Sequence, residues 1–267
     1  MIEQAQPDYV LETGHLPIIV TIPHDGRALP EHIATRMTQD GLGLPDTDFD
    51  VRLLYEFAAA LGCSVLAATW SRYVVDLNRS PAGTPLYPGQ RETGVCPVTT
   101  FAGEPIYIDG AGPDTDAIAA RVERYWQPWH DALAAEIARL HGIHGQVLVW
   151  EAHSIRSQVP ALFEGTLPDF NFGTDGGRTC PPDLLAAIAS RAREYGWRTV
   201  VDERFQGGYT TRHYARPEQR IWTVQLELSQ ATYRDESLDR LAPDGCDRVR
   251  TTLRNLLALA EHELTAL

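Results

Sequence analysis

Three apolar segments of this sequence each end in polar residues of the kinds that bind metals and move protons. Residues 147–150 lead into Glu-Ala-His-Ser-Ile-Arg at 151–156, residues 18–23 lead into His24-Asp-Gly26, and residues 73–75 lead into Asp76-Leu-Asn-Arg79. Open α/β sheets place their chemistry at the carboxyl ends of buried strands. A single histidine is more often a hydrogen-bonded residue in a connection, but three segments that end alike predict one shared site.

The two histidines of these segments and a nearby acid form a possible metal site. His24, His153 and one acid of residues 46–50 supply two imidazoles and one carboxylate, the usual ligand set of a catalytic zinc ion with an open position. The groups are far apart in sequence and match no compact motif such as His-Glu-x-x-His, so spacing alone does not favour a metal over its absence. The aspartates also suit the start of a helix at Val51, where they would cap its first turn.

One acid on a strand is a candidate for the general base of a hydrolase. A zinc-bound water with a pKa of about 7 can attack an amide at neutral pH, but the site also needs a base that is not a ligand. Glu227 fits this role because Gln225, Glu227 and Ser229 alternate with apolar residues and face one way on an otherwise buried strand. An ion pair between Glu227 and an arginine explains the same pattern equally well.

Three arginines, Arg79, Arg156 and Arg212, stand beside suspected site residues in the sequence. A guanidinium group binds a carboxylate in a bidentate fork that lysine cannot form, so these positions predict a substrate that carries carboxylates. Nucleophilic alternatives are weaker. No Gly-x-Ser-x-Gly motif surrounds Ser154, and the four cysteines are scattered without a Cys-x-x-Cys pair.

The composition argues against several other classes of protein. The 267 residues carry a formal net charge of -13, which disfavours a nucleic-acid partner because phosphate binding needs clustered Lys and Arg. No apolar run reaches the roughly 20 residues of a membrane span, and residues 1–8 lack the basic and apolar regions of a secretory signal. We therefore expect a cytoplasmic protein with neither a membrane nor a nucleic-acid partner; the sequence predicts no oligomeric state.

Apolar runs and helical periodicity alternate along the chain, which predicts an α/β fold with a three-layer mixed sheet and helices on both faces, in a single domain. The expected strands are residues 18–23, 63–69, 73–75, 147–156, 197–201 and 221–228. The expected helices are residues 51–61, 114–141, 182–195 and 239–266. Long loops rich in Pro and Gly at about 80–113 and 160–182 are expected to form walls of the active site.

Eight short blocks of the sequence occur in an order that is specific when they are taken together. They are Pro23-His-Asp-Gly26, Leu44-Pro-Asp-Thr-Asp48, Ser71-Arg-Tyr-Val-Val-Asp-Leu-Asn-Arg79, Ala152-His-Ser-Ile-Arg-Ser157, Leu167-Pro-Asp-Phe-Asn171, Gly207-Gly208, Thr211-Arg-His-Tyr214 and Val224-Gln-Leu-Glu-Leu228. Together they resemble the N-formylglutamate amidohydrolase family, the deformylases of histidine degradation. The resemblance implies a zinc-carboxypeptidase-like (phosphorylase/hydrolase-like) fold and hydrolysis of N-formyl-L-glutamate to formate and L-glutamate.

The resemblance also implies roles in the chemistry for individual residues. His24 and His153 are implied as metal ligands, with Asp48 as the third ligand and Asp46 as the alternative. The implied metal is zinc, although two imidazoles and a carboxylate also accept other divalent ions. Glu227 is implied as the general base that later protonates the leaving amine.

Further residues are implied in substrate binding. Asn78 and Arg79 are similar to the asparagine–arginine pair with which zinc carboxypeptidases hold a substrate carboxylate. The candidates for the second carboxylate or the oxyanion are Arg156, Arg212 and His213. The family often has an aspartate where this chain has Glu151, and a longer acid behind His153 would change the metal geometry. The expected partner is a small anionic N-acyl amino acid.

Two other functions are compatible with the same residues. A metal-dependent deacylase or carboxypeptidase with the same mechanism would act on a different N-acyl amino acid, because the loops at 80–113 and 160–182 set the shape of the pocket. A protein of another class would keep the fold and bind a dicarboxylate without turnover. Binding alone needs only the arginines, so the presence of Glu227 with both histidines favours an enzyme.

Overall fold

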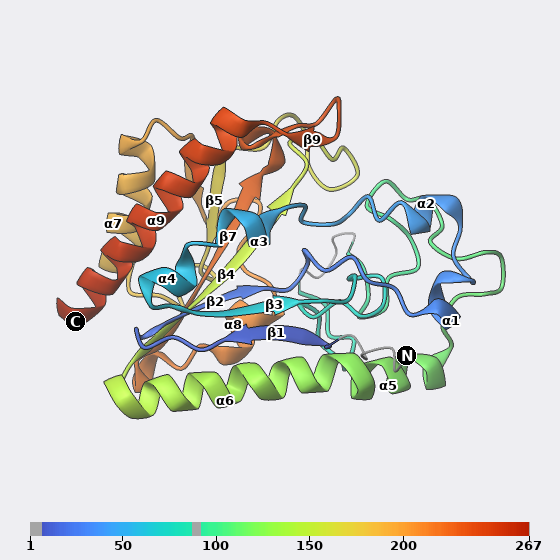
Figure 1. The fold of residues 1–267 in the computed structure, drawn as a ribbon, viewed down its shortest axis with the longest axis horizontal. Helices are drawn as coiled ribbons and strands as arrows, with labels where there is room; N and C mark the ends of the chain where they lie inside the picture. The colour runs from blue at the N-terminus through green and yellow to red at the C-terminus, as the bar shows by residue number, and fades with distance from the viewer. Residues whose placement is uncertain (1–6, 87–91, 267) are drawn as a thin grey trace, which may run out of the picture.

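A mixed sheet of seven strands lies at the centre of the computed structural model, which describes residues 7–86 and 92–266 (Figure 1). The order of the strands across the sheet is β1-β3-β2-β4-β7-β5-β6. Their bounds are β1 (Tyr9–Glu12), β2 (Ile18–Ile22), β3 (Ser64–Ala68), β4 (Val147–Ile155), β5 (Phe170–Gly173), β6 (Thr199–Val201) and β7 (Ile221–Ser229). A separate two-stranded ribbon consists of β8 (Arg234–Asp235) and β9 (Arg240–Leu241).

The four central strands, β3, β2, β4 and β7, run parallel to one another. The strand β1 is antiparallel to β3, β5 is antiparallel to β7, and β6 is parallel to β5. Because parallel strands end at the same edge of a sheet, the polar segments that follow or end β2, β4 and β7 come together there. The register of β4 and β7 places His153 opposite Glu227.

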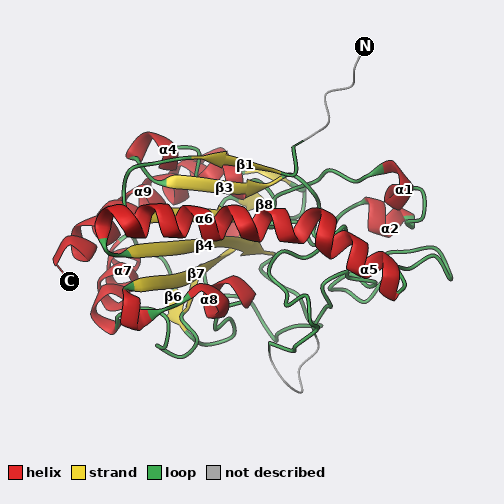
Figure 2. Ribbon diagram, turned by 90° about the horizontal axis from the view of Figure 1, so that it is seen from below, coloured by secondary structure: helices red, strands yellow, loops and turns green. Residues whose placement is uncertain are grey.

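Helices cover both faces of this sheet. Their bounds are α1 (Glu31–Ala34), α2 (Gln39–Leu42), α3 (Val51–Leu54), α4 (Ala58–Leu61), α5 (Thr115–Arg121), the π-helical η1 (Val122–Trp126), α6 (Gln127–His144), α7 (Pro182–Glu194), α8 (Tyr209–Tyr214), the short 3₁₀ turns η2 (Pro217–Gln219) and η3 (Gln230–Thr232), and α9 (Pro243–Ala266). The helices α3, α4, α7 and α9 pack on one face, and η1 and α6 pack on the other. Figure 2 shows α6 lying over the sheet.

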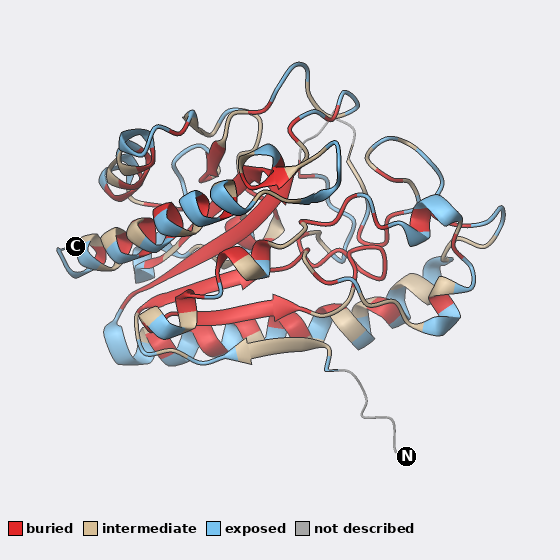
Figure 3. Ribbon diagram, turned by 45° about the horizontal axis from the view of Figure 1, so that its top comes forward, coloured by how far each residue is buried: buried red, intermediate tan, exposed pale blue. Residues whose placement is uncertain are grey.

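Alternation along β4 explains where the polar side chains of this strand go. Leu148 and Trp150 belong to the core beneath α7 and α9, whereas Val149 belongs to the core beneath α6. Every residue of β4 is buried, as Figure 3 shows for the central strands. Since side chains alternate between the faces, Glu151 and His153 lie on the same face as Val149, farther along the strand.

The predicted α/β architecture, a three-layer mixed sheet with helices on both faces, is confirmed. The prediction of a strand at residues 73–75 is wrong, because Ser71 accepts hydrogen bonds from the backbone N–H groups of Tyr73 and Val74 and bends the chain into a turn. The expected helix at residues 51–61 is interrupted between α3 and α4. Tyr55 and Phe57 both enter the core beneath α9, and side chains two residues apart cannot share one face of a regular helix.

The two predicted loops differ in their regularity. The described parts of the first, residues 80–86 and 92–113, contain neither a helix nor a strand, while residues 87–91 lie outside the described residues. The second contains β5, a short strand that pairs with β7. None of the helices in the described ranges is long and apolar enough to cross a membrane; the cytoplasmic location stays a prediction.

Candidate active site

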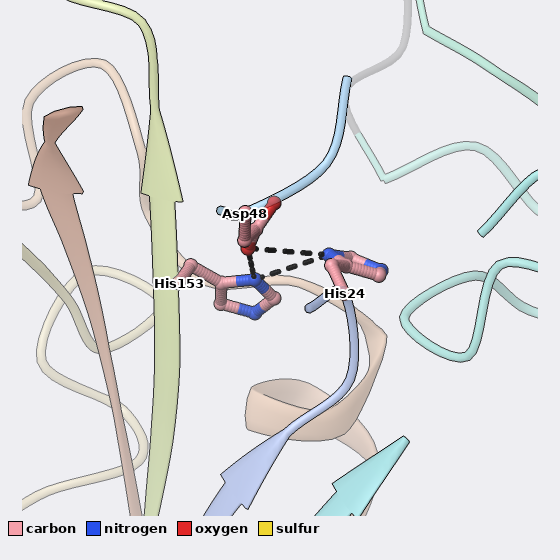
Figure 4. Close-up of side chains that lie close together, drawn as sticks. All are labelled: His24, Asp48 and His153. Carbon is pink, nitrogen blue, oxygen red and sulfur yellow. Dashed lines mark hydrogen bonds and ion pairs between the residues drawn. The ribbon is translucent and has the colours of Figure 1, made fainter. Parts of the chain in front are cut away.

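The two histidines predicted from the strand ends face each other. His24 follows the end of β2, and His153 lies near the end of β4. Both side chains are buried, and their Nδ1 atoms are 3.1 Å apart. Figure 4 shows the two rings converging on the carboxylate of Asp48. The parallel pairing of β2 with β4 brings them together, although they are widely separated in the sequence.

Asp48 completes this group from the segment before α3. Its Oδ2 atom lies 2.9 Å from Nδ1 of His153 and 3.7 Å from Nδ1 of His24, and it accepts a hydrogen bond of 3.1 Å from the backbone N–H of Ser154. Burial alone would raise the pKa of Asp48, but the hydrogen bonds and charges of the two histidines outweigh burial and hold the pKa well below its usual range. Asp48 is therefore a carboxylate at neutral pH.

Two further carboxylates lie behind the histidines. Nε2 of His24 is 2.8 Å from Oδ1 of Asp76, and Nε2 of His153 is 3.2 Å from Oε1 of Glu151. The other oxygen of Glu151 accepts a hydrogen bond from the hydroxyl of Thr211 at 2.5 Å. A carboxylate at one ring nitrogen orients the imidazole and leaves the other nitrogen for a metal. The longer Glu151 thus reaches His153 directly.

The donor set of His24, Asp48 and His153 fits a divalent metal ion. The ligand atoms of the three residues lie within 4.8 Å of one another. Nε2 of His24 lies beside Asp76, and Nε2 of His153 lies beside Glu151 and Asn78. The Nδ1 atoms of both rings therefore face each other and the carboxylate of Asp48. Burial lowers the pKa of His153, but Asp48 and Glu151 outweigh burial and raise the pKa to about 10. The group therefore attracts positive charge strongly.

Asp46, the alternative ligand, points elsewhere. Its Oδ2 atom accepts hydrogen bonds from the hydroxyl of Tyr73 at 2.6 Å and from the backbone N–H of Phe101 at 2.9 Å. Burial is the main reason that its pKa is raised. Asp46 therefore anchors the segment that carries Asp48 to the turn at Tyr73 and to the loop at Phe101.

Arg72 is a site residue that the sequence interpretation did not single out. Its side chain is buried, with Nη2 2.9 Å from Oδ2 of Asp76 and Nη1 3.6 Å from Oδ1 of Asp48. It thus links the acid behind His24 to the acid of the ligand group. The spacing of four residues between Arg72 and Asp76 could have indicated their ion pair. The strand expected at residues 73–75 hid this signal, because an extended chain would hold the two side chains apart.

Glu227 faces the same group from the neighbouring strand. A cavity that opens to solvent is lined by Glu227 together with His24, Asp48 and His153. Burial is the main cause that raises the pKa of Glu227 to about 8. Among the described residues none donates a hydrogen bond to its carboxylate, so the group is available to a water or a substrate in the cavity.

Three arginines of the described chain line this cavity: Arg72, Arg79 and Arg204. The guanidinium of Arg79 donates hydrogen bonds to the carbonyl groups of Thr93 and Asn78 at 3.0 and 3.1 Å, which fixes its direction. Nε of Arg204 donates to the carbonyl of Leu162 at 2.8 Å. Arg204 was not predicted, because it lies just beyond the last residue of β6 in a segment without a recognisable motif.

Arg156, Arg212 and His213 are not among the residues that line this cavity. Arg156 lies at the surface and pairs with Asp239 at 3.4 Å, because it is three residues beyond His153 and alternation along the strand turns it away. Arg212 pairs with Asp175 at 3.3 Å. The ring of His213 stacks on Tyr209 with 4.6 Å between the centroids. The structure therefore does not bring these three residues to the cavity that contains His24, Asp48 and His153.

Comparison with known proteins gives one family. Residues 16–234 match the N-formylglutamate amidohydrolase family. The N-formylglutamate deformylase of Pseudomonas aeruginosa is 43% identical over 246 residues, which cover 91% of this chain and 92% of that protein. A Pseudomonas putida protein of the same name is 43% identical over 225 residues, which cover 84% of each chain.

Two solved structures share the fold. The crystal structure of N-formylglutamate amidohydrolase from Ralstonia eutropha has a TM-score of 0.81 and 24% identity, and the match covers 97% of this chain and 98% of that chain. A gene product of Agrobacterium tumefaciens has a TM-score of 0.76 and 17% identity, and the match covers 97% of both chains. At these identities the likeness concerns the fold alone.

Proposed function

Because the chain belongs to the N-formylglutamate amidohydrolase family, we propose that it hydrolyses N-formyl-L-glutamate to formate and L-glutamate in a metal-dependent reaction. The two relatives that are 43% identical both carry the name N-formylglutamate deformylase. The observation that carries the proposal is the position of Glu227 opposite His153 in one cavity with His24 and Asp48. This constellation supplies a ligand group and a separate base.

The metal would be held by His24, Asp48 and His153, and zinc is the ion that best suits two imidazoles and a carboxylate. When bound, zinc lowers the pKa of a water to about 7 and polarises a carbonyl group. Asp76 and Glu151 keep the rings of His24 and His153 in the orientation that exposes Nδ1. Other divalent ions are also compatible with this set.

Glu227 would move the protons of the reaction. Its carboxylate accepts a proton from the attacking water and then donates it to the nitrogen of the leaving glutamate, so that this nitrogen leaves as a neutral amine and not as an amide anion. A base is most effective when its pKa lies near the working pH. Burial of Glu227, which raises its pKa towards about 8, provides this property.

The arginines that line the cavity would hold the two carboxylates of the substrate. Arg79 and Arg204 lie in its wall, and their guanidinium groups suit carboxylates better than an ammonium group does. Because the chain as a whole has a net charge of -13, an anionic substrate must be held by positive side chains placed locally in the cavity. The three predicted residues Arg156, Arg212 and His213 lie elsewhere and have no part in this proposal.

The proposal is tested by formate release from purified protein. We expect release from N-formyl-L-glutamate that a chelator abolishes and zinc restores, with much slower release from N-formyl-L-aspartate and slower hydrolysis of N-acetyl-L-glutamate. A preference for one of the other two substrates would identify a deacylase of another N-acyl amino acid. Metal-replete protein that hydrolyses none of them but binds L-glutamate would be a dicarboxylate-binding protein, and the proposal would be wrong.

A further inference from the structure

Gln225 is a buried polar residue of the cavity to which the mechanism above gives no role. It lies on β7 two residues before Glu227 and faces the same side of the sheet. Its side chain is only 4% exposed, yet it lines the same cavity as the ligand group. Buried side-chain amides normally have hydrogen-bond partners for both their oxygen and their nitrogen.

The backbone of Gly208 fixes which way this amide faces. The N–H of Gly208 donates a hydrogen bond of 2.9 Å to Oε1 of Gln225. Because a backbone N–H pairs with the oxygen of an amide and not with its nitrogen, the NH2 group must point away from Gly208. Within residues 7–86 and 92–266, no group accepts a hydrogen bond from that nitrogen. Gln225 therefore presents an unused donor to the cavity.

Asn78, the neutral donor that the family resemblance suggests, is engaged by the protein itself. Its Oδ1 atom accepts a hydrogen bond of 2.9 Å from the backbone N–H of Thr210. Its Nδ2 atom lies 3.1 Å from Nε2 of His153. Asn78 thus helps to hold the ring of His153 in place.

Gly208 also places Gln225 at the end of the cavity that contains Arg79. A Cβ atom on Gly208 would lie 2.1 Å from Nδ2 of Asn78, so the backbone of Gly208 touches the side chain of Asn78 while it binds Gln225. Arg79 follows Asn78 directly and lines the same cavity. Gln225 and Arg79 therefore line the same cavity, linked through the contact of Gly208 with Asn78.

We infer that the NH2 group of Gln225 donates a hydrogen bond to an oxygen of one substrate carboxylate beside Arg79, an inference that rests on the proposed function. Arg79 supplies the charge, and Gln225 supplies a neutral donor whose direction is set by Gly208. A carboxylate placed there satisfies the donor that the folded protein leaves unpaired. The residue thereby contributes to the choice of an amino dicarboxylate over shorter or uncharged N-formyl amino acids.

The test uses Gln225→Met, which keeps the length of the side chain and removes the donor. A hydrogen bond to a charged group stabilises a complex enough for about a 10- to 100-fold change in affinity. We expect kcat/KM for N-formyl-L-glutamate to fall by about this factor, with unchanged zinc content. A matched control is Gln146→Met at the amino end of β4, where the side chain binds Leu264 and Arg220; it should lower Tm without changing KM.

Substrates that lack one carboxylate distinguish the loss of a contact with that carboxylate from a general disturbance of the active site. N-formyl-4-aminobutyrate lacks the α-carboxylate, and N-formyl-L-2-aminobutyrate lacks the side-chain carboxylate. Gln225→Met should not affect kcat/KM for the analogue that lacks the contacted carboxylate, but it should reduce kcat/KM for the other. An equal fall for all three substrates, or no fall for N-formyl-L-glutamate, would overturn the inference.

A second variant guards against loss of folding. Gln225→Glu keeps an oxygen for the N–H of Gly208 but replaces the donor by a second oxygen, so we expect a larger loss than for Gln225→Met. If the wild-type protein releases no formate, the proposed function is wrong; the same variants are then compared by calorimetric titration with L-glutamate, 4-aminobutyrate and L-2-aminobutyrate. Wild-type protein that does not bind L-glutamate would overturn the inference as well.

Discussion

The Nδ1 atoms of His24 and His153 lie 3.1 Å apart, and the second of them is 2.9 Å from Oδ2 of Asp48. Each ring has its other nitrogen beside a carboxylate, Asp76 or Glu151. Two buried imidazoles and the carboxylate of Asp48 thus bring three ligand atoms within 4.8 Å of one another, a set that fits a divalent metal ion. The first prediction from this arrangement therefore concerns metal binding.

Asp48→Asn should abolish stoichiometric zinc binding, whereas Asp46→Asn should preserve it. The first substitution removes a charged ligand and should weaken zinc affinity by more than about 100-fold. The second keeps an oxygen for the hydroxyl of Tyr73 and the N–H of Phe101, so stability should stay within about 1 kcal/mol. Zinc analysis of the two proteins after dialysis checks this; zinc retained by Asp48→Asn and lost by Asp46→Asn would reverse the assignment.

Glu151→Gln should weaken zinc binding by about 10- to 100-fold, because the negative charge beside Nε2 of His153 is removed. Competition with a chromophoric chelator measures the affinity. Glu136→Gln is the matched control, since Glu136 is also buried but pairs with Ser64 and Arg139 in a different part of the molecule. Equal zinc affinities of the Glu151 variant and the wild type would show that the acid does not support the ligand.

Trp126→Phe should raise KM, because Nε1 of Trp126 donates a hydrogen bond of 3.1 Å to the backbone carbonyl of Arg79. Loss of this bond should also lower the free energy of unfolding by about 1 kcal/mol. Trp129→Phe removes the same ring volume from α6, which follows η1 directly, but Nε1 of Trp129 has no partner among the described residues. Kinetics of both variants should show the effect on KM only for Trp126; equal effects would exclude a role for the bond.

The stability of the protein should fall as the pH decreases below 6.5, partly through His130. Burial lowers the pKa of His130 to about 3, and its Nε2 atom is 2.9 Å from the carbonyl oxygen of Leu77. Between pH 6.5 and 3 the unfolded state binds a proton that the folded state does not, which costs up to about 1.4 kcal/mol per pH unit. Urea unfolding measures the free energy of unfolding between pH 7 and 5. This free energy should fall less steeply with decreasing pH for His130→Gln than for the wild type; identical slopes would contradict this.

The strand ends were predictable because the signals are local. The apolar runs of β2, β4 and β7 are continuous, and alternation along β7 correctly places Gln225 and Glu227 on one face. Parallel neighbours bring their carboxyl ends to one edge, so His24 and His153 follow from the order of the elements.

Residues in turns and loops were less predictable because long-range contacts decide their direction. Asp46 and Asp48 are two residues apart, and only the contacts with Tyr73 and Phe101 separate their roles. Arg72 is buried through ion pairs with Asp76, four residues further along the same segment, and with Asp48 from another segment. The second contact is not revealed by composition or spacing. Proximity in the sequence to His153 was misleading for Arg156, since strand geometry turns it to the surface.

The most direct test of the mechanism is formate release from N-formyl-L-glutamate by zinc-loaded Glu227→Gln, measured beside the zinc-loaded wild type. Removal of a general base typically costs about 10²- to 10⁴-fold in rate. The amide keeps the size of the side chain and is not a ligand, so the account predicts full zinc occupancy with kcat reduced by at least about 100-fold. Full occupancy with kcat within tenfold of the wild type would contradict the role of Glu227 and the mechanism built on it.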